Sequence, residues 1–119
     1  MGKKVKYKFD YMYEDMVMST VTVYTDGSVD EQDFTDIKMF KANCRNEKHV
    51  NLLFSTMVFD ENRPDKDEIL ENLEIPFYDP YLIVRVTKGL MASSCQWIRF
   101  EGDTITWQEL RARALLPTY

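Results

Sequence analysis

Residues 4–25 read KVKYKFDYMYEDMVMSTVTVYT, and this stretch decides the fold. Between residues 4 and 13, aromatic and aliphatic side chains alternate with lysines and an aspartate. This is the period of a β-strand with one apolar and one charged face. Residues 17–25 are rich in β-branched side chains and predict a second strand. The Glu14-Asp15 pair predicts the turn between them, so the chain opens with two antiparallel strands.

The next turn is marked by Asp26-Gly27, a strong short-range signal for a β-hairpin. A type I′ turn requires a positive φ at both of its central residues, which this dipeptide favours. Residues 28–34 then predict a third, more polar strand. Together the three strands predict an N-terminal antiparallel β-meander.

Helical periodicity replaces the alternation after residue 34. Thr35 or Asp36 is a candidate cap for a short helix. The apolar residues that share one face of this helix are Ile37, Phe40 and Cys44. The spacing of apolar residues then predicts a second helix over residues 47–59.

Proline and glycine delimit two further helices. Pro64 fits the first turn of one of them, in which the apolar residues are Ile69, Leu70 and Leu73. Asp79-Pro80 is the combination of cap and proline that begins the other helix. Gly89 is suited to the left-handed conformation that ends it.

The chain closes with a strand and a helix. Residues 95–100 predict a strand that should add to the meander, because an isolated strand is not stable. Thr106 and Glu109 have the spacing of a capping box, which opens a final helix. The body of this helix extends to Leu115, and Pro117 stops it.

This order of elements predicts the fold class. Strands first, helices in the middle, and a C-terminal strand plus helix are typical of an α+β fold. A length of 119 residues fits a single domain over residues 1–119. The expected core consists of Val5, Tyr7, Phe9, Val21, Val23, Leu53, Phe54, Ile69, Leu73, Ile83, Val86, Ile98 and Leu110.

The chain is acidic, with 15 Lys and Arg residues against 20 Asp and Glu residues and a net charge of -5. This balance disfavours sequence-independent binding of duplex nucleic acid, which needs clustered cations. The acids are concentrated in residues 26–36 and 60–74, which are either solvated surface or a surface for a basic partner. The candidate partner-binding residues are Asp30, Glu31, Asp33, Asp60, Glu61, Asp65, Asp67, Glu68, Glu71 and Glu74.

One string invites a catalytic interpretation. Residues 23–28, VYTDGS, resemble the first-strand motif of ribonuclease H, in which the aspartate binds catalytic metal. Glu68 and Asp79 are the candidates for the further carboxylates of such a site. We interpret Asp26 as a turn residue and Asp79 as a helix cap, so we expect no metal site, no cofactor and no catalysis. His49 has no Ser, Cys or acid at the spacing of a catalytic triad.

The two cysteines, Cys44 and Cys95, form no CxxC motif. Their wide separation and the single histidine of the chain favour free thiols in a reducing cytosol over a zinc site or a disulfide. No apolar run at the N-terminus is typical of a secretory signal, and no apolar segment is long enough to span a membrane.

Four lysines near the N-terminus alternate with aromatic residues: Lys3, Lys4, Lys6 and Lys8. Basic residues interleaved with aromatics can bind single-stranded nucleic acid, which leaves a nucleic-acid-binding accessory protein as an alternative function. Alternation places the lysines and the aromatics on opposite faces, however. We therefore interpret the lysines as protection of an edge strand.

The second half of the chain carries more distinctive strings, which are YDPYLIVR at residues 78–85, KG at 88–89, WIRFEG at 97–102 and TW at 106–107. Together with YKFDYMY at residues 7–13, they resemble small uncharacterised proteins of Firmicutes plasmids, phages and integrative elements. Residues 59–67 depart from the pattern of that group. Members of the group sit among anti-defence genes, and the chain is similar to type II-A anti-CRISPR proteins.

The resemblance implies a non-enzymatic inhibitor that binds the type II CRISPR effector nuclease, or its guide-RNA complex, in the cytoplasm of a bacterial cell. The effector holds RNA and DNA in basic channels, so the acidic segments are the contact that we expect. The protein would then contact nucleic acid only through this partner. An aromatic contact near Trp97 and Trp107 is the other possible surface, and a metal-dependent nuclease like ribonuclease H remains an alternative function.

Overall fold

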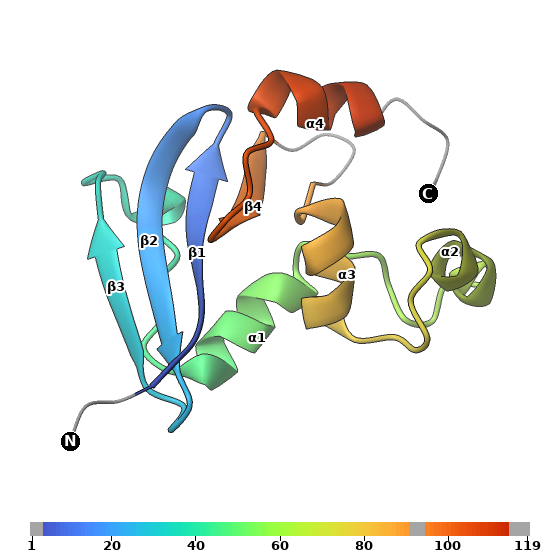
Figure 1. Ribbon diagram of the computed structural model, residues 1–119, viewed down its shortest axis with the longest axis horizontal. Helices are drawn as coiled ribbons and strands as arrows, with labels where there is room; N and C mark the ends of the chain where they lie inside the picture. Colours follow the sequence, from blue (N-terminus) through green and yellow to red (C-terminus); the bar gives the residue numbers. More distant parts are fainter. Residues whose placement is uncertain (1–3, 91–94, 115–119) are drawn as a thin grey trace.

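The computed structural model describes residues 4–90 and 95–114 (Figure 1). Lys3, Leu115 and Pro117, which the sequence analysis gave roles, lie outside these described residues.

Four antiparallel strands form one sheet in the order β3-β2-β1-β4. The strands are β1 (Val5–Tyr13), β2 (Met16–Tyr24), β3 (Val29–Asp33) and β4 (Gln96–Phe100). The first three strands form the expected meander, and β4 pairs with the second half of β1, where Phe9 lies opposite Phe100 and Tyr13 opposite Gln96. The prediction that the last strand adds to the meander is confirmed.

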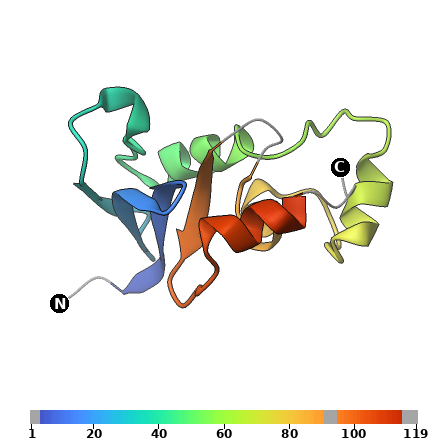
Figure 2. The ribbon, with the colours of Figure 1, turned by 90° about the horizontal axis from the view of Figure 1, so that it is seen from above.

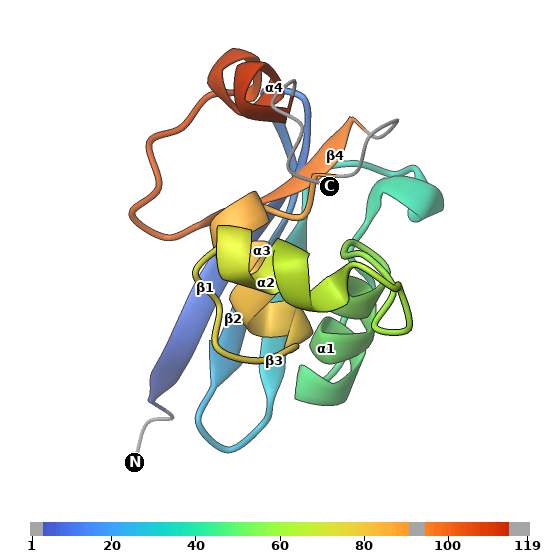
Figure 3. The same cartoon turned by 90° about the vertical axis from the view of Figure 1, so that its right-hand side faces the viewer.

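The helices are α1 (Glu47–Ser55), α2 (Lys66–Asn72), α3 (Pro80–Thr87) and α4 (Trp107–Ala114), with a short 3-10 turn η1 (Lys38–Phe40) before them. Figure 1 shows α1 and α3 beside the sheet, with α2 beyond them as the helix farthest from it. Figure 3, seen from that side, shows α2 in front of α3. The α+β class predicted from the sequence is confirmed.

The core lies on both sides of β4. Ile98 and Phe100 pack toward α1 and α3, whereas Trp97 packs with Leu110 of α4 on the other side. Figure 2 shows β4 between α1 and α4 in accordance with this arrangement. Eight residues of the expected core are buried, namely Phe9, Val21, Val23, Phe54, Ile69, Ile83, Ile98 and Leu110. Four others are half-buried, namely Tyr7, Leu53, Leu73 and Val86.

Val5 was expected in the core but is 55% exposed. Its partner across the sheet is Tyr24, whereas the partner of Tyr7 is Val23, so the pairing register shifts between Val5 and Tyr7. A β-bulge of this kind interrupts the alternation of faces. The period-2 pattern of the sequence therefore assigns Val5, at the start of β1, to the buried face, and this assignment is wrong.

The hairpin between β2 and β3 is present, but its predicted turn type is wrong. The Gly27 amide donates to the Tyr24 carbonyl (3.0 Å), and Gly27 has a φ of 85°. Asp26 is not among the described residues with a positive φ, so the loop is a turn followed by a left-handed glycine rather than a type I′ turn. The Asp26 carboxylate accepts from the Ser28 amide (2.9 Å), which stabilises this wider loop.

The short helix predicted to follow a cap at Thr35 or Asp36 is reduced to the single 3-10 turn η1, so that prediction is wrong. The Glu31 carboxylate accepts from the backbone amides of Asn43 (3.1 Å) and Cys44 (2.7 Å). Asn43 has a φ of 56°, and Ile37, expected on the buried face, is 52% exposed. Hydrogen bonds from backbone to a side chain of β3 thus replace the helical ladder in this segment.

The other helix boundaries deviate less. α1 ends at Ser55 rather than near residue 59, and α2 begins at Lys66, which leaves Pro64 outside the helix. The cap of α3 is confirmed, because the Asp79 carboxylate accepts from the Tyr81 amide (3.0 Å). Gly89 is left-handed as expected, immediately after a left-handed Lys88.

Candidate functional site

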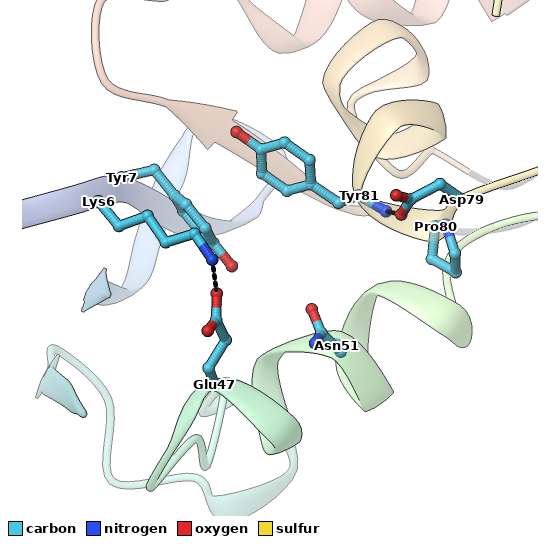
Figure 4. Close-up of a pocket in the computed structure, with 7 residues that line it drawn as sticks. All are labelled: Lys6, Tyr7, Glu47, Asn51, Asp79, Pro80 and Tyr81. Carbon is cyan, nitrogen blue, oxygen red and sulfur yellow. Dashed lines mark hydrogen bonds and ion pairs between the residues drawn. The ribbon is translucent and has the colours of Figure 1, made fainter. Parts of the chain in front are cut away.

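A cleft of about 510 Å³ opens where the start of β1 meets the first turns of α1 and α3 (Figure 4). The residues that line it are Lys6, Tyr7, Glu47, Asn51, Asp79, Pro80 and Tyr81. The sequence predicted Tyr7 in the core, Asp79 and Pro80 at the start of a helix and Lys6 on the surface of a strand, but it did not predict that these residues line one cleft. The sequence predicts helices that begin near Glu47 and Pro80. The approach of these two helix ends to β1 depends on the tertiary fold.

The bulge in β1 brings Lys6 into this cleft. Lys6 lies beside Tyr7 on the helix side, and its ammonium group lies 2.6 Å from a carboxylate oxygen of Glu47. The expectation that all the lysines lie opposite the aromatics is therefore wrong for Lys6. The expectation of an edge strand fails from Phe9 onward, where β1 pairs with β4 on its other side.

Two tyrosine rings form the apolar part of the cleft. The ring centroids of Tyr7 and Tyr81 lie 4.9 Å apart at an interplanar angle of 43°. Burial raises the pKa of Tyr7, and the negative charge of Glu47 adds to the effect. The Tyr7 phenol therefore stays protonated at neutral pH and is not a general base.

A second hollow, of about 660 Å³, lies next to the first. It is lined by Ser55, Val58, Phe59, Asp60, Glu61, Asn62, Tyr78 and Pro80, and Pro80 belongs to both hollows. The Tyr78 hydroxyl donates to the Phe59 carbonyl (2.7 Å). Burial raises the pKa of Tyr78, and the charges of Glu61 and Asp60 raise it further. Carboxylates thus line both hollows.

The candidate acids of residues 60–74 differ in what they contact. The Asp60 carboxylate accepts from the Asn62 amide (2.8 Å), and Asp65 pairs with Arg63 (2.7 Å). The remaining acids of this stretch are exposed: Glu61, Asp67, Glu68, Glu71 and Glu74. Within the described residues, none of these five has an ion-pair partner. They form the part of the stretch that is available to a partner.

The candidate acids of β3 are largely engaged within the protein. Glu31 binds the two backbone amides described above, and the Tyr24 hydroxyl donates to Asp30 (2.7 Å). Asp33 accepts from the hydroxyl of fully buried Ser19 (2.8 Å). Burial, together with the hydrogen bond to Asp33, raises the pKa of Glu31, while the same hydrogen bond lowers the pKa of Asp33. Asp30, Glu31 and Asp33 thus accept hydrogen bonds within the protein, while Asp30 and Asp33 remain exposed.

The side chains of Trp97 and Trp107, which were considered as an aromatic contact for a partner, expose little surface. Trp97 is fully buried, and its indole N–H donates to the Glu14 carbonyl (2.7 Å), while Trp107 is half-buried. Exposed apolar side chains occur instead after β3, and they include Phe34, Ile37 and Met39, the last 74% exposed. Leu52 and Phe77 are also exposed, so this segment is one of several exposed apolar sites.

The residues considered for catalysis are not brought together. Asp26 lies in the loop after β2, Glu68 lies on α2, and Asp79 caps α3. Across residues 4–90 and 95–114, no group of three or more His, Cys, Asp or Glu side chains is placed to hold a metal ion. His49 has a structural contact, because its Nδ1 accepts from the Arg45 amide (3.2 Å).

Cys44 and Cys95 are free thiols, the first buried and the second half-buried. In the part of the chain that the structure describes, no helix is long and apolar enough to cross a membrane. Comparison of the chain with protein-family models, with curated proteins and with solved structures finds no match.

Proposed function

We propose that this protein is a non-enzymatic inhibitor that binds the type II CRISPR effector nuclease through its acidic face. The identity of the partner comes from the resemblance of residues 7–13 and 78–107 to type II-A anti-CRISPR proteins. The site of action is then the bacterial cytoplasm, where the effector meets its guide RNA. Binding would occupy a basic nucleic-acid channel of the effector or block the loading of guide RNA.

The observation that carries the proposal is the concentration of carboxylates around two adjoining hollows and on α2. We define the acidic face as the two adjoining hollows together with the exposed acids of α2 and its end. Residues 60–74 contain seven acids against Arg63 and Lys66. Charges of one sign gathered around hollows attract an oppositely charged surface and accelerate its association.

The alternative of a nucleic-acid-binding accessory protein has less support. The start of β1 offers Lys4 and Lys8 as exposed cations, but Lys6 is paired with Glu47. Binding to the phosphate backbone needs several free cations on one surface. The acidic face next to this strand would repel nucleic acid.

A matched pair of charge variants tests the proposed contact. The double variant Glu68→Gln/Glu71→Gln removes two exposed charges from α2, and Glu14→Gln/Glu101→Gln removes two exposed charges elsewhere. We expect the α2 variant to associate with the effector more slowly by about threefold or more at low salt, since steering depends on charges at the contact. The control variant should keep the wild-type rate.

The salt dependence completes this test. The difference between the two variants should shrink as salt rises above about 0.15 M, where charges separated by more than about 8 Å are screened. Stopped-flow or surface plasmon resonance measurements give the association rates. Equal rates for both double variants would show that α2 is not the contact.

A further inference from the structure

The cleft between β1, α1 and α3 offers acceptors that the protein does not use. Glu47 engages Lys6 through Oε2, and Asp79 engages the Tyr81 amide through Oδ1. Among the described residues, the second oxygen of each carboxylate has no hydrogen-bond partner. The side-chain amide of Asn51 points into the same space (Figure 4) and makes no hydrogen bond to a described residue.

The cleft also presents aromatic faces to a bound group. Tyr7 and Tyr81 contact each other and line the wall opposite α1 (Figure 4). Elsewhere on this cluster, the chain's own Arg85 already stacks on aromatic rings, with its guanidinium carbon 4.3 Å from the ring centroid of Phe100 and 5.8 Å from that of Tyr81. Aromatic rings beside carboxylates are the surroundings that a planar cation prefers.

The cleft already holds one cation of its own. The ammonium group of Lys6 pairs with Glu47, yet the Lys6 side chain is 50% exposed. An ion pair with this degree of exposure is weak, so a better cation can displace the lysine into solvent. With Glu47 and Asp79 against a single lysine, the lining favours a cation over an anion.

We propose that this cleft binds a guanidinium group, the side chain of an arginine on the protein partner. A guanidinium is planar and donates two parallel hydrogen bonds to a carboxylate, here Glu47 in place of Lys6. Its flat face would lie against the ring of Tyr7 or Tyr81, and its remaining donors would point toward Asn51, with the charge of Asp79 adding to the attraction. The inference deepens the proposed function, on which it rests for the source of the arginine.

An NMR titration of the isotope-labelled protein with N-acetyl-L-arginine amide tests the inference without the effector. We expect shifts confined to the cleft, including the side-chain amide of Asn51. N-acetyl-L-citrulline amide has the same shape without the charge, and it should bind more weakly by about tenfold, the effect of losing one charged hydrogen-bonded pair. Equal binding of both probes, or shifts spread over the acidic face, would overturn the proposal.

Two variants shift the affinity in opposite directions. Glu47→Gln should weaken binding of the arginine probe by about tenfold, because the bidentate acceptor is lost. Lys6→Ala should tighten binding by about two- to fivefold, because the competing internal cation is removed. Lys8→Ala, which removes the same charge from an exposed position on the same strand, is the matched control and should change nothing. Tighter binding by both lysine variants would mean a general charge effect and no defined site.

Free L-arginine serves as a second probe, because the same guanidinium exists as a small molecule. A blocked arginine that binds as tightly as L-arginine supports a protein side chain as the ligand. Clearly tighter binding of free L-arginine than of the blocked arginine would refute the proposal that the ligand is a protein side chain. The titration contains no effector, so it tests the guanidinium site alone. Whether the effector is the partner is tested separately, by the binding experiments with the effector.

Discussion

The Glu31 carboxylate should hold residues 38–44 in place. The variant Glu31→Ala measures its contribution to the free energy of unfolding. This variant removes the acceptor of the Asn43 amide (3.1 Å) and of the Cys44 amide (2.7 Å). A hydrogen bond to a charged group is worth about 1.5–3 kcal/mol. Partial exposure of Glu31 and relief of its repulsion with Asp33 offset part of this contribution. We therefore expect a loss of about 2 kcal/mol of unfolding free energy in total.

Urea denaturation followed by the fluorescence of buried Trp97 is the suitable assay. With an m value of roughly 1–3 kcal/mol/M, a loss of 2 kcal/mol lowers the midpoint by about 1 M. Glu31→Gln keeps one acceptor and should lose about half as much. Gln32→Ala changes the exposed neighbour on the same strand and should stay within about 0.5 kcal/mol of the wild type. If Glu31→Ala were as stable as Gln32→Ala, the carboxylate would not be an anchor.

Three further predictions concern stability and reactivity. Because burial raises the pKa of Tyr7 above its unfolded value of roughly 10, the stability associated with the protonated phenol is lost as pH rises above that value. Tyr7→Phe should therefore show a smaller alkaline loss of stability than the wild type in thermal melts between about pH 8 and pH 11. Burial raises the pKa of the Cys44 thiol to about 12, so iodoacetamide should modify half-buried Cys95 first, as followed by mass spectrometry. Gly89→Ala should cost about 1–3 kcal/mol of backbone strain plus a clash with a side chain 2.9 Å from the new Cβ, whereas Gly102→Ala carries only the strain.

The sheet and its helices were predictable from the sequence because their signals are local. Alternation defined β1 and β2, the Asp79 cap defined α3, and the Thr106–Glu109 capping box defined the start of α4, where the Glu109 amide donates to the Thr106 hydroxyl (3.2 Å). Each signal depends on residues within a few positions of one another. Such signals remain valid when the tertiary fold is unknown.

The segment after β3 was not predictable, because contacts distant in the sequence decide it. The apolar spacing of Ile37 and Phe40 favours a helix, but Glu31 binds the backbone of residues 43 and 44 and stops it. Phe40 packs instead against Tyr13, with ring centroids 5.2 Å apart. No sequence pattern reveals that Glu31 accepts from this backbone, because the two segments meet only in the tertiary fold.

The cleft was missed for a related reason. The register shift between Val5 and Tyr7 places Lys6 on the side of Tyr7, against the period of the sequence. Glu47 and Asn51 are one helical turn apart on α1 and were read only as part of a helix. An acid, an amide and a tyrosine on two helices line one cleft only because the tertiary fold places both helices beside the start of β1.

A pull-down with the purified type II effector nuclease, both free and loaded with guide RNA, tests the central claim most directly. The protein should bind at least one of the two forms, and in a cleavage assay it should inhibit the nuclease at stoichiometric amounts at low salt. Glu68→Gln/Glu71→Gln should inhibit less than Glu14→Gln/Glu101→Gln. Absence of binding to either form, with cleavage unchanged at an excess of inhibitor, would contradict the proposed function.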